Sequence, residues 1–203
     1  MSGRTAPAEH SIKPIIAKRW SGRAIDPRPV DRALVLSMLE AARWAPSCFA
    51  DEPWRFMLWD KERNADSWDA AMNTLVPANQ QWARNAPILI LVLADSQFSR
   101  NDKPNRWGQY DTGAATENLH LQGVANGLVV HQMGGFDADA VQLAFGIPDR
   151  FTAMSMIAVG HPGNVDDLDE GYRDGETATR ARRPLSELVF EGAWDQPLIK
   201  TDE

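Results

Sequence analysis

The sequence predicts an α+β or mixed α/β fold, in which helices outnumber the strands and separate them along the chain. Residues 87–94 read PILILVLA, a nearly continuous apolar run that is typical of a strand covered on both faces. Residues 31–44 carry apolar side chains at helical spacing. Residues 111–126 form a long helical pattern rich in glycine and alanine, which would let another helix approach closely. We therefore expect this helix at the centre of the fold or at an interface.

The N-terminal half begins with a polar stretch and then alternates between helices and strands. Pro27 and Pro29 interrupt the chain before the helix at 31–44 begins. The apolar sequence WRFMLW after Pro53 predicts a strand. The elements predicted here are an extended tail at 1–13, helices at 14–20, 31–44, 64–75 and 78–85, a strand at 54–59, and a polar loop at 101–107.

The C-terminal half is expected to contain two apolar strands, two helices and an acidic loop. Asp137 would cap a helix that ends before Gly146 and Pro148. The predicted elements are strands at 128–133 and 152–160, helices at 137–145 and 184–190, a mobile loop at 164–178 and an extended tail at 192–203.

Composition limits the classes of protein to which this chain can belong. The 203 residues contain no repeat, low-complexity segment or linker, so we expect one domain over 1–203. The net charge of −7 argues against a nucleic-acid partner. Cys48 is the only cysteine, which fits a reducing cytoplasm. The N-terminus lacks the apolar core of a signal peptide, and the longest apolar run, 86–94, is too short to span a membrane.

The motifs of several common enzyme classes are missing. The sequence has neither G-x-G-x-x-G after a strand nor G-x-x-x-x-G-K-[ST], so the two common nucleotide-binding loops are absent. It also has no G-x-S-x-G, which argues against Ser47 as a hydrolase nucleophile. We predict no metal site, because the four histidines stand apart in the sequence: His10, His120, His131 and His161.

Two arginine clusters and one proline-bounded turn remain as possible binding elements. Residues 19–23 read RWSGR and residues 180–184 read RARRP, so the two clusters could converge on one anion or could balance nearby acidic side chains at the surface. The turn at 46–53 contains Ser47 and Cys48 between two prolines. Its backbone N–H groups could lack helical partners and so bind a cofactor, or the turn could be a plain loop.

The order and spacing of several motifs resemble the nitroreductase family of FMN-dependent oxidoreductases. The motifs are RWSGR, AARWAPSCFADEPWRF, NQQWARNAPILIL, a Gly-Ala-rich helix, GLVVHQMGGFD, FGIP, IAVGHP and RARRP, from about residue 14 to residue 190. The resemblance implies a three-layer α/β/α sandwich with a central mixed, mostly antiparallel sheet. It also implies an intertwined homodimer that binds two FMN molecules at the subunit interface.

The resemblance assigns cofactor contacts to particular residues. The family's first FMN motif is matched by Arg19, Trp20, Ser21 and Arg23, and the loop that the partner subunit lays against the flavin is matched by Pro46, Ser47 and Cys48. A pyrimidine contact is matched by Asn79, and the segment whose backbone N–H faces flavin N5 is matched by Met133, Gly134 and Gly135. The basic pair on the phosphate is matched by Arg180 and Arg182.

The implied reaction is a ping-pong transfer in which NAD(P)H reduces FMN, and the flavin then reduces a nitroaromatic, a quinone or an enone. We expect no catalytic residue in the strict sense, because the protein supplies position and charge, with Arg23 as the cation that stabilises the anionic reduced flavin. Alternatives are a specialised flavoenzyme of the same fold, either dehydrogenating or dehalogenating, with 164–178 as its lid, and a non-catalytic flavin-binding protein. The physiological substrate and the choice between NADH and NADPH stay open.

Some positions depart from the family pattern. Ala50 and Glu52 stand where asparagine and glutamine are common, and Cys48 replaces a serine. Glu52 could place a negative charge near the flavin or point to solvent, and Cys48 could be redox-active or a small buried side chain. Trp82 stands where some members have a lysine. Trp107 and Tyr110 could line the substrate face or pack in the core.

Overall fold

The computed structural model describes residues 5–198 and is built around an antiparallel sheet. Within this part of the chain the strands are β1 (Ile25–Asp26), β2 (Trp54–Asp60), β3 (Ile88–Asp95), β4 (Val129–Met133) and β5 (Phe151–Pro162). β5 pairs with β1, β3 and β4, and β2 pairs with β3. The expected mostly antiparallel sheet is confirmed, and every pairing among the described strands is antiparallel. β1 was not predicted, because two residues carry no readable alternation.

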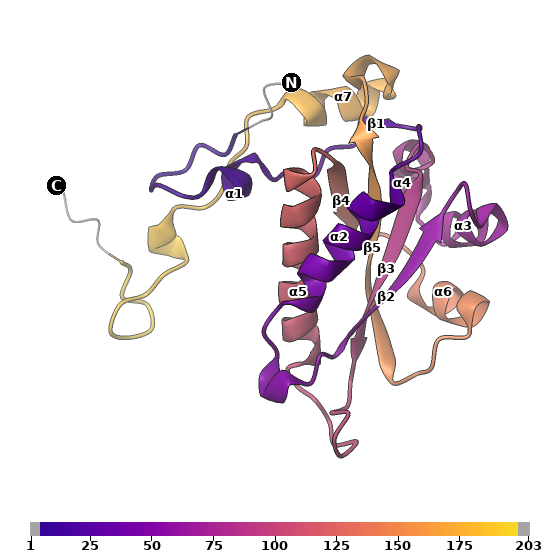
Figure 1. Ribbon diagram of the computed structural model, residues 1–203. Helices are drawn as coiled ribbons and strands as arrows, with labels where there is room; N and C mark the ends of the chain where they lie inside the picture. The colour runs from indigo at the N-terminus through magenta and orange to yellow at the C-terminus, as the bar shows by residue number, and fades with distance from the viewer. Residues whose placement is uncertain (1–4, 199–203) are drawn as a thin grey trace.

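Helices cover both faces of this sheet (Figure 1). The helices of the described residues are α1 (Pro14–Lys18), α2 (Arg32–Arg43), α3 (Ala65–Asn73), α4 (Pro77–Ala83), α5 (Gly108–Ala125), α6 (Ala138–Phe145) and α7 (Glu170–Thr177). The Asp137 carboxylate accepts the N–H of Ala140, and α6 ends at Gly146 in the left-handed conformation, as predicted. None of the helices in residues 5–198 combines the length and apolar character needed to cross a membrane.

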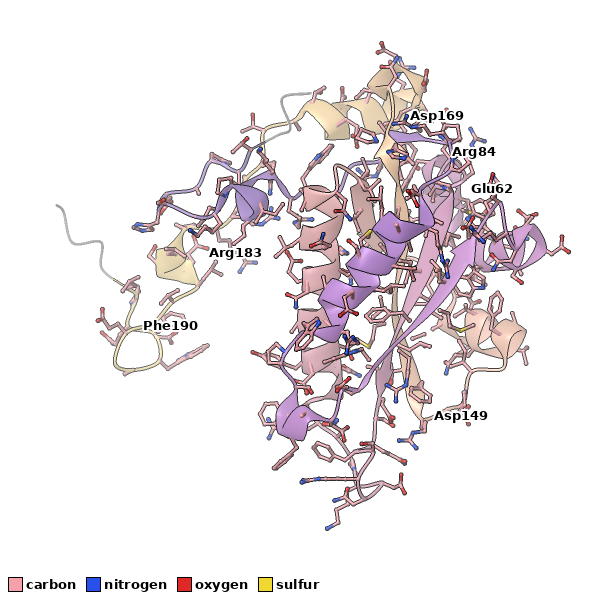
Figure 2. The ribbon with its side chains drawn as sticks, in the orientation of Figure 1. Glu62, Arg84, Asp149, Asp169, Arg183 and Phe190 are labelled. Atoms are coloured by element: carbon pink, nitrogen blue, oxygen red, sulfur yellow. The ribbon has the colours of Figure 1, made fainter. Side chains whose placement is uncertain are left out.

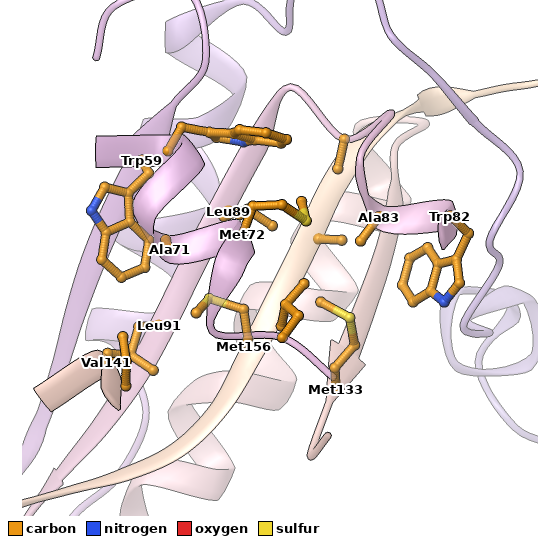
Figure 3. Close-up of a cluster of buried hydrophobic side chains, with 14 of the residues drawn as sticks. Trp59, Ala71, Met72, Trp82, Ala83, Leu89, Leu91, Met133, Val141 and Met156 are labelled. Carbon is orange, nitrogen blue, oxygen red and sulfur yellow. The ribbon is translucent and has the colours of Figure 1, made fainter. Parts of the chain in front are cut away.

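Buried side chains form two clusters, one on each face of the sheet. Alternate residues of β3 point to opposite faces, so Ile88, Ile90 and Val92 join α2 and α5, whereas Leu89 and Leu91 join α3, α4 and α6. Figure 3 shows the cluster on the face covered by α3, α4 and α6, which is rich in tryptophan, methionine and leucine side chains. The three-layer arrangement is therefore confirmed, and the apolar run at 87–94 is buried on both faces because each face has its own helical layer.

Three sequence predictions about local structure are wrong. Residues 164–178 were predicted to be a mobile loop, but they form a 3₁₀ turn at Val165–Asp167 and the helix α7. The acidic composition concealed two buried anchors, Leu168 and Glu176. The helix expected at 184–190 is only a 3₁₀ turn at Leu185–Glu187. The first helix ends at Lys18 rather than at Trp20.

The N-terminal segment with α1 and the C-terminal segment after α7 run side by side at one side of the sandwich (Figure 1). Arg180 Nη1 donates a hydrogen bond to the backbone oxygen of Ala17 at 2.8 Å, which joins the C-terminal segment to α1. In Figure 2, Arg183 and Phe190 lie on the part of this segment that projects from the body. Of the two predicted tails, residues 1–4 and 199–203 lie outside the described range.

Candidate functional site

The RWSGR stretch connects α1 to β1 and is held from several sides. Arg19 Nη1 donates to Ser21 Oγ at 3.2 Å. A Cβ atom on Gly22 would lie 2.9 Å from the Trp20 ring, so the ring can cover this position only because it is glycine. His131 Nδ1 contacts the backbone oxygen of Gly22 at 3.0 Å, and because that oxygen is an acceptor, the histidine donates. The stretch, named the RWSGR segment here, is therefore an irregular connection that is held beside β4.

The structure brings one residue of the second arginine cluster close to the RWSGR segment. Arg180 bonds the oxygen of Ala17, two residues before Arg19. Arg182 is exposed and donates to the adjacent Ala181 oxygen. A cavity of about 300 Å³ lies between residues 6–12 and the basic residues of the C-terminal segment. No ion pair of the described residues involves Arg19, Arg23 or Arg182.

Two buried histidines lie beneath these charges. The pKa of His120 is lowered from 6.5 to about 4, mainly by burial and then by the positive charges of Arg19 and His131. Burial also lowers the pKa of His131 to about 4; Arg23 and Arg19 act in the same direction, whereas the hydrogen bond to Gly22 opposes them. His120 Nε2 has no hydrogen-bond partner among the described residues. Both imidazoles are consequently neutral at pH 7, and the positive charge of the site comes from arginine.

These pKa values predict a loss of stability in mild acid. On unfolding, each histidine regains a pKa near about 6.5. As the pH falls through that value toward about 4, the unfolded chain binds protons that the folded chain refuses, so the free energy of unfolding decreases, and below about 4 this contribution levels off. When the pH is lowered from about 7 to about 5, the free energy of unfolding measured in urea should fall by about 2 kcal/mol less for His120→Leu than for the parent protein. The exposed His10→Gln variant is the control, and identical pH slopes in all three proteins would contradict the prediction.

Gly134 and Gly135 follow β4 and meet the start of α4. Asn79 Nδ2 donates to the backbone oxygen of Gly135 at 3.0 Å, and Val76 donates its N–H to the same oxygen at 3.1 Å. A Cβ atom on Gly135 would lie 2.8 Å from Asn79 Nδ2, so the close approach depends on glycine. One on Gly134 would meet nothing within 4 Å, and its N–H donates no hydrogen bond within residues 5–198. This segment therefore offers a free donor beside open space.

The proline-bounded turn at 46–53 is more fully hydrogen-bonded than the sequence suggested. Cys48 donates its N–H to Asp111 Oδ2 at 2.9 Å, and Glu52 donates its N–H to Ser47 Oγ at 3.0 Å. Both N–H groups lack a helical partner, as expected, but a distant carboxylate and a serine hydroxyl accept them, so neither is free to bind a cofactor. Pro46 is exposed and Cys48 is half-buried. The Glu52 side chain is exposed.

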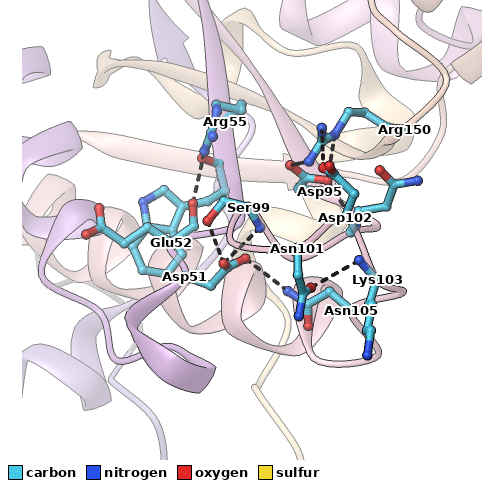
Figure 4. A network of polar contacts seen from close by, with 12 residues as sticks. Asp51, Glu52, Arg55, Asp95, Ser99, Asn101, Asp102, Lys103, Asn105 and Arg150 are labelled. Carbon is cyan, nitrogen blue, oxygen red and sulfur yellow. Dashed lines mark hydrogen bonds and ion pairs between the residues drawn. The ribbon is translucent and has the colours of Figure 1, made fainter.

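The same turn is strained and is fastened to a neighbouring loop. Phe49, Ala50 and Glu52 have φ values of 57°, 53° and 51°, in the left-handed region that costs about 1–2 kcal/mol for each residue with a side chain. Asp51 holds the turn, because its carboxylate accepts from the N–H and the hydroxyl of Ser99 at 3.0 and 2.7 Å (Figure 4). Such strain is concentrated at functional sites more often than elsewhere.

Trp107 and Tyr110, at the start of α5, are both exposed in this chain. Their rings contact each other edge to face, with centroids 6.4 Å apart. Core packing within the chain is therefore excluded, and a role at the substrate face stays open.

Within one chain, the structure does not gather all of the predicted site residues. The turn at 46–53 is hydrogen-bonded to Asp111, near the start of α5. Arg19 lies near His120, whose pKa its charge lowers, and His120 is nine residues further along the same helix. At 1.5 Å per residue, this separation is about 13 Å. The turn and the arginines therefore lie toward opposite ends of α5.

Sequence reasoning missed Glu176 and Tyr172, which contact Arg23 from α7. No motif marks either residue, since both stand in a segment whose acidic composition is typical of a solvated loop.

Comparisons with known proteins agree with the family resemblance of the motifs and with the fold described above. The family model described as "Nitroreductase family" matches residues 16–161. An uncharacterised 15.4 kDa protein of Mycolicibacterium smegmatis is 33% identical over 140 residues, which covers 68% of this chain and 93% of that protein. A candidate NADH dehydrogenase/NAD(P)H nitroreductase of Archaeoglobus fulgidus is 28% identical over 168 residues, covering 80% and 91%. A solved structure described as an oxidoreductase containing FMN superposes with a TM-score of 0.88 at 30% identity, covering 96% of this chain and 98% of that one.

Proposed function

The chain belongs to the nitroreductase family, and we propose that it is an FMN-dependent oxidoreductase that uses NAD(P)H to reduce an electron-poor acceptor such as a nitroaromatic, a quinone or an enone. The observation that carries the proposal is the RWSGR segment, where the guanidinium groups of Arg19 and Arg23 lie beside neutral, buried histidines. The name of the Archaeoglobus relative and the FMN in the superposed structure support the choice of cofactor and reductant.

The donor set of the chain fits FMN. A phosphate that is nearly a dianion needs several cations when it leaves water, and Arg19, Arg180 and Arg182 are the groups that would hold it. Arg23 would face the pyrimidine edge, and the free N–H of Gly134 would donate to the central ring. Asn79 keeps one amide N–H besides the one given to Gly135. These residues bind and orient, and none of them has to exchange a proton.

When bound, FMN supplies ping-pong hydride transfer between NAD(P)H and the acceptor. The chain would contribute the rest: positive charge from the arginines, and a backbone donor at Gly134 beside open space that the flavin ring could occupy.

We further propose that the working unit is a single-domain chain paired with a second copy, in the cytoplasm. Large apolar side chains are exposed on the two projecting end segments, namely Ile12, Ile16, Leu185, Leu188 and Trp194. Such exposure is typical of an interface. A partner would also bring its 46–48 turn to the arginines, from which it is separated within one chain. The lone cysteine supports a reducing compartment.

An absorbance spectrum followed by anaerobic addition of NADH or NADPH tests the function. The purified protein should be yellow, should bleach with a nicotinamide nucleotide and should recover its colour with a quinone or a nitroarene. A colourless protein that FMN cannot reconstitute would refute the cofactor assignment. A yellow protein that neither nucleotide bleaches would refute the NAD(P)H reaction.

A further inference from the structure

The helix α7 packs directly on Arg23. The Glu176 side chain is only 6% exposed, and its Oε1 accepts the backbone N–H of Arg23 at 2.9 Å. Burial of a carboxylate is costly unless hydrogen bonds or charges compensate it. A buried glutamate on an otherwise acidic, exposed helix is therefore a specific contact rather than a solvated surface group.

The guanidinium of Arg23 lies close to two aromatic rings. Its central carbon is 5.7 Å from the Tyr172 ring centroid and 5.9 Å from that of the buried Trp82, both within the range of cation–π attraction. A Cβ atom on Gly175 would lie 3.5 Å from Arg23 Nη1, so the backbone of α7 also runs close to the guanidinium. Both the main chain and the side chain of Arg23 are thus held by α7.

The α7 segment is itself held in place. The hydroxyl of Tyr172 lies 2.6 Å from the Ala78 oxygen and 2.8 Å from Gln81 Oε1, which ties the ring to α4. Arg173 donates to the backbone oxygens of Leu168 and Asp166, each at 2.8 Å, and closes the loop before the helix. Residues 165–177, named the clasp here, form a preorganised unit.

We propose that the clasp is a positioning element for the flavin, in which Glu176 holds the backbone of Arg23 and Tyr172 holds its guanidinium, so that the charge would stand at the pyrimidine edge. This inference rests on the proposed function. A long arginine side chain that is free to move loses rotamer entropy when it binds, and a side chain already held loses less. A fixed positive charge beside the pyrimidine favours the reduced, more negative cofactor and raises its midpoint potential.

The test measures FMN affinity and midpoint potential in the holoprotein. Tyr172→Ala and Glu176→Ala should each weaken FMN binding about 10-fold and lower the potential. Glu176→Gln keeps an oxygen acceptor for the Arg23 N–H and should not lower the potential. Tyr172→Phe keeps the ring but loses its hydrogen bonds to α4, so it should lower the potential less than Tyr172→Ala does. Glu170→Gln, which neutralises an exposed carboxylate on the same helix, is the matched control.

The direction of the potential shift separates positioning from simple electrostatics. Loss of a carboxylate near the cofactor would by itself raise the potential, whereas displacement of Arg23 lowers it. Tyr172→Ala should also shift the potential no further once Arg23 is replaced by alanine. Folded variants that bind FMN with unchanged affinity and potential would overturn the inference. If Glu176→Ala does not fold, the comparison of Tyr172→Ala with Tyr172→Phe still decides. Absence of FMN from the parent protein would instead refute the proposed function.

Discussion

Replacement of Arg19 and Arg182 together by alanine is expected to release FMN from the protein. Each guanidinium would give charge-assisted hydrogen bonds to the phosphate, and the loss of two such partners should weaken binding by about 100-fold or more. Arg182 is exposed, and within residues 5–198 its side chain donates one hydrogen bond, to the adjacent Ala181, so its removal disturbs little else. The protein should lose its yellow colour on desalting, and fluorescence titration with FMN gives the affinity.

A matched control separates phosphate binding from a general loss of charge. Arg43 and Arg84 are exposed, and the pair of Arg43 with Glu40 is a surface pair of small expected value. Arg43→Ala/Arg84→Ala removes the same net charge and should stay yellow. If the Arg19/Arg182 variant also stays yellow after desalting, the proposed phosphate site is wrong.

The largest expected effect on stability comes from Leu119→Ala on α5. Leu119 is completely buried in the cluster that joins α2, α5 and the sheet. Removal of its side chain leaves a cavity that rigid neighbours cannot fill, and should lower the free energy of unfolding by about 2–5 kcal/mol. Urea denaturation of the FMN-free protein measures this quantity without a contribution from the cofactor.

Leu143→Ala on α6 is the matched control, because Leu143 is 86% exposed. Its replacement should change the free energy of unfolding by no more than about 0.5 kcal/mol. Equal losses in the two variants would mean that α5 does not pack on the sheet as described.

Local patterns in the sequence predicted most of the fold. The apolar run at 87–94 matches β3, and the helical spacing at 31–44 matches α2, each to within one residue at either end. Asp137 and Gly146 bound α6 as expected, because capping depends on neighbouring backbone groups alone. The prediction of a loop at 164–178 failed for the opposite reason: Leu168 and Glu176 are buried by partners far away in the sequence.

The candidate site was predicted in its parts but not in its arrangement. Composition and motif order pointed to the arginines, the glycines after β4 and the turn around Ser47, since these are features of residue type and spacing. The contacts of Arg180 with Ala17, of His131 with Gly22 and of Glu176 with Arg23 join residues more than 100 positions apart. Residue type and local spacing thus determined the elements and the chemistry available, whereas only the packed chain decided which charges are held, which histidines are neutral and which donors stay free. Burial and electrostatic interactions depend on distance in space, and local sequence patterns do not record that distance.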